Sequence, residues 1–143
     1  MVFEHVLDTG PSMMYSITEQ VLEDIKAFGV TDGLAVVYCP HTTAAITINE
    51  GADPSVVSDL LKGLEAISPQ RASYTHGEGN SHAHLKSTLV GVSQTLVIEN
   101  GRLLLGTWQS VFFCEFDGPR RRKYYVKIIN GSPIVSHMAA GQK

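Results

Sequence analysis

The sequence lacks an apolar stretch long enough to cross a bilayer, so we expect no transmembrane helix and no membrane partner. Its N-terminus, MVFEHVLDTG, has no basic start followed by an apolar run, so a secretory signal is not expected either. Charged residues make up only 17% of the chain, the net charge is −3 and the pI is near 6.0, which argues against a general nucleic-acid binder. A cytoplasmic protein is therefore the default expectation.

The chain also lacks the phosphate-binding loops of nucleotide-binding folds, since no GxGxxG or Walker sequence follows a predicted strand. Its two cysteines, Cys39 and Cys114, form neither a CxxC pair nor zinc-finger spacing. Both lie in apolar runs, and we interpret them as reduced core thiols. Repeats and linkers are absent as well, so the 143 residues are predicted to form a single domain, 1–143, with a substantial core.

The segment 17–28 carries apolar residues at helical spacing and predicts a first helix. Ser16 and Glu19 are spaced as a capping box at its start, and Gly29 occupies the usual stop position. A second helix is predicted between Asp53, its N-cap, and the Ser68-Pro69 pair. A short third helix is favoured over 84–90, because Leu85 and Leu89 are four residues apart.

Strands are predicted over 2–8, 34–39 and 43–48, and Asn100-Gly101 indicates a tight hairpin. The segment Trp108–Phe116 reads as a further strand, and we expect Tyr124–Ile129 to pair with it across the turn at Asp117–Arg120. Strands outnumber helices and are predicted to be joined mostly by hairpins. These elements predict an α+β fold, an antiparallel β-sandwich or open barrel with two main helices.

Half of the six histidines lie in HGEGNSHAHLK, where Gly77 and Gly79 permit sharp turns. With His41, at the end of a predicted strand, they are candidate ligands for a zinc-like ion. On a strand, His82 and His84 would share one face, whereas on a helix they point about 200° apart. The helical prediction therefore favours one of the two as a ligand. Loop histidines without a metal are the alternative.

Other polar residues accompany the histidines. Glu78 is positioned to orient a histidine or to act as an acid or base, and Lys86 begins the short helix, where it suits phosphate binding. Asp53 is favoured as a helix cap over a site residue, and Trp108 suits a core position as well as a stacking surface. The further candidates are Asn49, Thr107, Gln109 and the basic run 120–123, which reads as a solvated turn or a local anion site.

A distance argument limits this set. On one straight strand, His41 and Asn49 would be roughly 26 Å apart at about 3.3 Å per residue. Either the strand starts after His41 and bends, or the residues near Asn49 act on a neighbouring subunit's site. Both options stay open.

Three stretches occur in order: HTTAAITINEGADPSVVSDL, YTHGEGNSHAHLKSTLVG and GRLLLGTWQSVFFCEFDGPRRR. In order and spacing they resemble the YjbQ-like family, whose members are described as secondary thiamine-phosphate synthases. The resemblance runs from about residue 15 to residue 130. It implies a compact α+β fold, a homotrimer and a divalent metal, zinc by preference, held by His41, His76 and His84. His82 falls outside the family's motif, whereas motif positions include Glu78, Lys86, Asn49, Asp53, Thr107 and Gln109.

The resemblance implies a metal-associated enzyme that joins a pyrimidine methyl pyrophosphate to a thiazole phosphate and releases pyrophosphate. Glu78, Lys86, Asn49 and Gln109 are the catalytic candidates, and the expected partner is a small phosphorylated substrate. Two alternatives remain. One is a metal-dependent hydrolase of a small phosphorylated or acyl substrate, and the other is a non-catalytic binding oligomer that a metal braces. His137, in the C-terminal tail, is unassigned.

Overall fold

The structure is a computed structural model that describes residues 1–131, so the tail with His137 lies outside the described residues. Within that range the chain forms eight strands and three helices. The helices are α1 (Thr18–Phe28), α2 (Pro54–Ile67) and α3 (Ser81–Val90). The strands are β1 (Val2–Asp8), β2 (Met13–Ser16), β3 (Gly33–Tyr38), β4 (Ala44–Glu50), β5 (Ser93–Glu99), β6 (Arg102–Leu103), β7 (Gln109–Glu115) and β8 (Arg121–Asn130).

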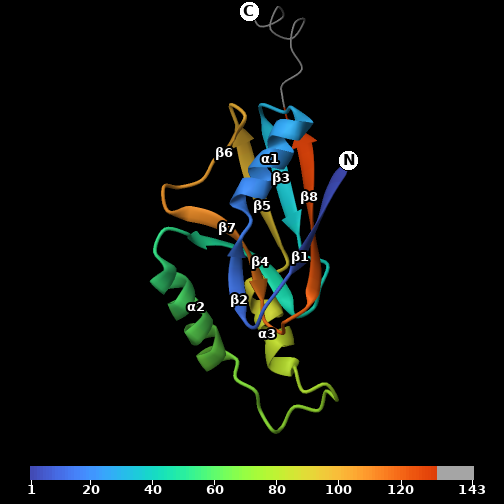
Figure 1. Cartoon of the computed structure of the whole chain (residues 1–143), viewed down its shortest axis with the longest axis vertical. Coiled ribbons are helices and arrows are strands. Elements are labelled where there is room, and N and C mark those ends of the chain that lie inside the picture. The colour runs from blue at the N-terminus through green and yellow to red at the C-terminus, as the bar shows by residue number, and fades with distance from the viewer. Residues whose placement is uncertain (132–143) are drawn as a thin grey trace, which may run out of the picture.

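The strands form two antiparallel sheets, ordered β1-β8-β3-β5-β6 and β2-β7-β4 (Figure 1). The main core lies between them and includes Val37 of the first sheet, Phe113 of the second, and Val21 and Ile25 of α1. The predicted α+β class with antiparallel sheets is confirmed. None of the three helices in residues 1–131 is long and apolar enough to cross a membrane.

The smaller sheet also packs on its other face. Phe112, Cys114 and Phe116 form a second core with Ala83 of α3, and the apolar stripe of α2 lies against it. No residue of α2 is fully buried, and Ile67 at its end is 65% exposed. Helices α2 and α3 lie together at one end of the molecule, joined by an extended loop (Figure 1). This loop, residues 68–80, carries His76 and Glu78.

Local sequence signals located most elements correctly. Asp53 caps α2 by accepting a hydrogen bond from the Ser55 backbone N–H at 2.9 Å. Gly29 ends α1 in the left-handed conformation, with φ of 79°, which favours glycine. The Asn100-Gly101 hairpin joins β5 to β6, and α3 begins at Ser81, three residues before the predicted start. Cys39 and Cys114 are buried free thiols, as predicted, and burial raises their pKa values to about 11 and about 12.

Two predictions at strand level were wrong. Strand β8 pairs with β1 and β3, not with β7, so the turn at Asp117–Arg120 passes from one sheet to the other. The only pairing between consecutive strands in residues 1–131 is β5 with β6, so hairpins do not dominate. A turn signal predicts a reversal of direction. It does not identify the partner strand, which depends on residues far away in the sequence.

The capping box at the first helix was also wrong. Ser16 is the last residue of β2, and the N-cap position is held by Ile17 without a side-chain cap. The start of α1 is instead held by the smaller sheet. Ile17 N–H donates to the Val111 carbonyl at 2.8 Å, and Val111 N–H donates to the Thr18 hydroxyl at 2.9 Å.

Candidate functional site

A polar pocket of about 410 Å³ gathers the three predicted metal-binding histidines. His41 belongs to the segment between β3 and β4, His76 to the 68–80 loop, and His84 to α3. We call this cavity the histidine pocket. Its other lining residues are Pro40, Thr42, Thr43, Glu78, Asn80, Arg120 and Arg122. The fold therefore brings together groups from four separate parts of the chain, with both cationic and anionic side chains among them.

His76 and His84 are in direct contact. Their ring centroids are 5.4 Å apart and the ring planes lie at 86° to one another. The loop that carries His76 is tied at its base, since the Gln70 amide donates to the Gly79 carbonyl at 2.6 Å and the Ser68 hydroxyl donates to the His82 carbonyl at 2.9 Å. These contacts hold the loop against α3 and place the His76 imidazole beside that of His84.

His82 points elsewhere, as the helical argument requires. Its Nδ1 lies 2.9 Å from the Gln70 Oε1 atom, outside the histidine pocket. Gln70 thus contacts both His82 and the Gly79 carbonyl. His82 therefore braces the 68–80 loop on the side of α3 away from His84.

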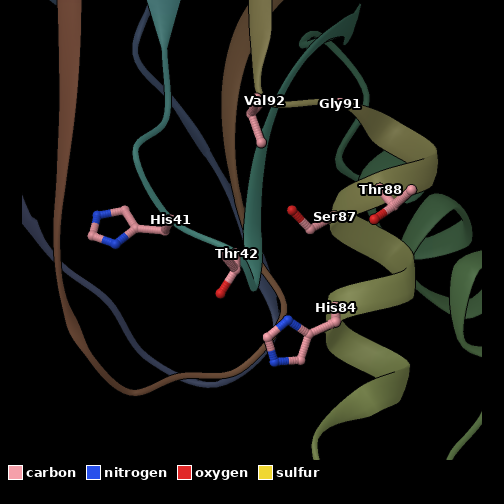
Figure 2. A pocket seen from close by; sticks show the side chains of 7 residues that line it. All are labelled: His41, Thr42, His84, Ser87, Thr88, Gly91 and Val92. Carbon is pink, nitrogen blue, oxygen red and sulfur yellow. The ribbon is translucent and has the colours of Figure 1, made fainter.

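His41 is held by the backbone of β8. Its Nε2 atom accepts a hydrogen bond from the Lys123 N–H at 2.8 Å. A neutral imidazole has one proton, so the Nδ1 atom carries it in this arrangement. Burial and the nearby charge of Arg122 lower the pKa of His41, which favours the neutral ring. Figure 2 shows this ring turned away from α3, whereas His84 projects from the helix toward Thr42.

Asn80 presents an unpaired acceptor in the same pocket. Its side-chain amide donates to Asp117 Oδ2 at 2.7 Å, which identifies the other atom as the carbonyl oxygen. That oxygen, Oδ1, is the only buried side-chain N or O atom in residues 1–131 without a hydrogen-bond partner, and Asn80 is only 7% exposed. A buried unpaired acceptor is costly unless a donor or a cation meets it. Asn80 Oδ1 is therefore a free acceptor in this pocket for a donor from water or a ligand.

The basic run divides between the two faces of β8. Arg121 and Lys123 lie on the exposed outer face, where they approach Asp8 at 3.9 Å and Glu4 at 3.5 Å. Arg120 and Arg122 line the histidine pocket. The solvated-turn interpretation thus describes Arg121 and Lys123, whereas an anion site at Arg120 and Arg122 stays a prediction.

Arg122 is anchored by a buried carboxylate. Its Nε and Nη2 atoms donate to Glu115 at 2.8 and 2.5 Å, and Nη2 also donates to the Thr43 hydroxyl at 2.9 Å. Arg120 is more exposed and donates to Asp117 Oδ2 at 2.8 Å. Sequence reasoning missed Asn80 and Thr43, and it did not separate Arg122 from the rest of the basic run. The period of two along β8 was the signal that separates Arg122 from Arg121 and Lys123.

Lys86 lies outside the histidine pocket. Its ammonium group is buried, pairs with Glu65 of α2 and lines a different cavity, with Leu61, Leu64 and Phe116. Lys86 is four residues after His82 and shares its face of α3, so the periodicity that separated His82 from His84 also separates Lys86 from His84. The structure therefore does not bring the Lys86 ammonium group together with the three histidines.

Asn49 and Gln109 lie at the far end of the smaller sheet. Glu50 pairs with Gln109 there, whereas Ala44, which follows the His41 segment, pairs with Glu115 at the opposite end. The strand thus starts after His41. Ala44 and Asn49 are separated by about 16 Å of strand, so Asn49 and Gln109 are not brought to the histidine pocket of the same chain. Trp108 is 64% exposed at this far end and is not a core residue.

The donor types of the histidine pocket suit a zinc-like ion, since imidazole, carboxylate and amide oxygens all line it. The positions of these side chains suit such an ion only in part. Within residues 1–131, no three His, Cys, Asp or Glu side chains are close enough together to hold a metal. His76 and His84 are adjacent, but Nε2 of His41 accepts the Lys123 hydrogen bond and its Nδ1 carries the proton. His41 would have to leave Lys123 to become a ligand.

Comparison with known proteins decides the family. A family model described as "UPF0047 protein YjbQ-like" matches residues 4–131. The chain belongs to the YjbQ/UPF0047 family. The protein MJ1081 of Methanocaldococcus jannaschii is 53% identical over 130 residues, which cover 90% of this chain and 94% of that protein. YugU of Bacillus subtilis is 51% identical over 117 residues, covering 81% and 89% of the two chains.

Solved structures of this family have the same fold. A crystal structure of a YjbQ/UPF0047 family protein from Clostridium acetobutylicum matches with a TM-score of 0.87 at 54% identity, covering 89% of this chain and 99% of that one. The protein APE1520 of Aeropyrum pernix matches with a TM-score of 0.86 at 34% identity, covering 91% and 98%. The names of these family members state no activity, so function has to be argued from the site.

Proposed function

We propose that this YjbQ/UPF0047 protein is a metal-assisted enzyme that acts on a small phosphorylated substrate in the histidine pocket. The observation that carries the proposal is the composition of this one cavity, in which three histidines and Glu78 lie with Arg120 and Arg122. Guanidinium groups recognise phosphate oxygens through paired hydrogen bonds. Histidines and a carboxylate supply metal-binding and acid–base groups.

The reaction we propose is the one that the family resemblance implies, thiamine-phosphate synthesis. The carbon–oxygen bond from the pyrimidine methylene to pyrophosphate breaks, its electron pair leaves with pyrophosphate, and the thiazole nitrogen forms the new bond to that carbon. Negative charge grows on the leaving group, so cationic groups beside it lower the barrier. Arg120 and Arg122, which line the histidine pocket, would supply that charge.

His76 and His84 would hold the metal, with His41 as the third ligand if it turns away from Lys123. A bound zinc-like ion would supply Lewis-acid charge to the phosphate oxygens. Asn80 Oδ1 would accept a hydrogen bond from the substrate or from water, which removes its unpaired state. Arg122 is held rigidly by Glu115 and Thr43, so its charge is already oriented before the substrate arrives.

A second candidate, metal-dependent hydrolysis, is favoured by one feature. Glu78 is an exposed carboxylate in the same pocket as His76 and His84, where it suits a general base for water. Product analysis separates the two reactions. A phosphorylated substrate incubated alone yields inorganic phosphate or pyrophosphate under hydrolysis, whereas the transfer reaction needs the thiazole phosphate as acceptor. A tight metal with neither reaction supports the non-catalytic binding oligomer.

Pyrophosphate binding tests the proposal directly. Replacing Arg120 with alanine should weaken pyrophosphate binding by about tenfold, because one charge-assisted contact is lost. Replacing Lys86 with alanine should leave the affinity unchanged, since Lys86 faces Glu65 in another cavity. Titration calorimetry on zinc-supplemented protein measures both. If Lys86→Ala weakens binding and Arg120→Ala does not, the anion lies elsewhere and the proposed site is wrong.

We also propose that the chain assembles as a homotrimer, as the family resemblance implies. The outer face of the larger sheet supports assembly, because it exposes several apolar side chains together. Between 38% and 52% of the surface of each of these residues is exposed: Val2, Leu34, Tyr38, Val97 and Ile129. Light scattering should give a mass near three times 15.5 kDa. A stable monomer at micromolar concentration would contradict the assembly, and with it any role for Asn49 and Gln109 in a neighbour's site.

A further inference from the structure

A second cavity of about 410 Å³ adjoins the histidine pocket. His41, Thr42 and His84 line both cavities, so the two are neighbouring compartments with a shared boundary. The remaining lining of the second cavity comes from the end of α3 and the segment that joins it to β5: Ser87, Thr88, Gly91 and Val92. Figure 2 shows this space between the helix and the segment that carries His41 and Thr42.

The two compartments differ in chemistry. The histidine pocket contains Glu78, Arg120 and Arg122, whereas the second cavity is lined by no Asp, Glu, Lys or Arg side chain and mostly by apolar surface. Three polar groups of its wall already have hydrogen-bond partners. The Ser87 hydroxyl donates to the Ala44 carbonyl at 2.7 Å, and the Gly91 and Val92 carbonyls accept from Ile46 and Cys39.

A charged group would lose its hydration in the second cavity without gaining an opposite charge. An uncharged group loses little and buries apolar surface against Val92. Each compartment is of the size usual for a small-ligand site. The pair thus suits a molecule with one anionic end and one uncharged end.

We infer that the second cavity binds the uncharged ring or apolar group of a phosphorylated substrate whose phosphate lies in the histidine pocket. This inference rests on the proposed function and adds the place in the fold where the uncharged part of the substrate binds. The bond between the two parts lies at the boundary formed by His41, Thr42 and His84. Inorganic phosphate uses the histidine pocket alone.

The test compares methyl phosphate with phenyl phosphate, which differ in the uncharged group. Wild-type protein should bind phenyl phosphate about tenfold more tightly, because the ring buries apolar surface that methyl cannot. Two variants fill the second cavity, Val92→Phe and Thr88→Trp. Both should remove the preference for phenyl phosphate and leave methyl phosphate affinity unchanged. Thr88 is exposed on α3, so Thr88→Trp keeps the test informative if Val92→Phe does not fold.

The matched control is Leu89→Trp, which adds a similar bulk at the next position of α3. Leu89 is 56% exposed and lines neither compartment, so the preference for phenyl phosphate should survive. The inference is overturned if wild-type protein binds both phosphates equally, or if the preference persists in both filled variants. A different result is that wild-type protein binds none of these phosphates, inorganic phosphate included. That result would contradict both the proposed function and the inference.

Discussion

Replacing Glu115 with glutamine is expected to lower the free energy of unfolding by about 3–5 kcal/mol. The Glu115 side chain is 0% exposed and neutralises Arg122, itself only 4% exposed. Glutamine keeps the shape and removes the charge, so the Arg122 guanidinium is left buried without a counter-charge. Domains of this kind are stable by only about 5–15 kcal/mol, and the loss is a large part of that. Urea denaturation followed by circular dichroism measures it.

A matched control lies one residue away on β8. Asp8 and Arg121 form an exposed pair at 3.9 Å, and both side chains are about three-quarters exposed. Asp8→Asn should change the free energy of unfolding by less than about 0.5 kcal/mol, because water and salt screen exposed pairs. Equal losses in Glu115→Gln and Asp8→Asn would show that the buried pair has no special part in stability.

The same carboxylate predicts a pH dependence. Burial alone raises the pKa of Glu115, but hydrogen bonds from Arg122, Thr9 and the Asp117 backbone outweigh it and hold the pKa below its ordinary value of 4.5. A depressed folded-state pKa contributes stability above pH 4.5 that is lost as pH falls through the lower folded-state value. The wild-type protein should therefore lose this contribution in acid, and Glu115→Gln should show a smaller loss over that range.

Replacing His84 with alanine should reduce zinc affinity by at least about 100-fold, since even groups behind the ligands contribute 10- to 100-fold. His84 contacts His76 in the histidine pocket, whereas His82 contacts Gln70 outside it. His82→Ala is therefore the control and should retain about one zinc ion per chain. Metal analysis after dialysis, with thermal unfolding to confirm the fold, distinguishes the two variants. A site emptied by His82→Ala and retained in His84→Ala would remove His84 from the metal site.

Features that depend on neighbouring residues were predictable from the sequence. Asp53 and Pro54 begin α2, Gly29 ends α1, and Asn100-Gly101 turns the chain between β5 and β6. The helical period also separated His84 from His82. Applied again to Lys86, the same period would have placed it with His82 and away from the histidine pocket.

Features that depend on distant residues were decided by the tertiary structure. Thr9 and Glu115 are 106 positions apart and share a hydrogen bond, and Arg122 and Thr43 are 79 apart. No local period reports such pairs, because each forms only when strands of different sheets come together. Contacts between distant residues also decide three other features: the partners of β8, the unpaired oxygen of Asn80 and the distance of Asn49 from His41. The sequence by itself determined most of the elements, the family and the face of α3 that His84 occupies. The tertiary structure alone decided which charges surround the histidines, because burial and pairing are set by contacts between residues far apart along the chain.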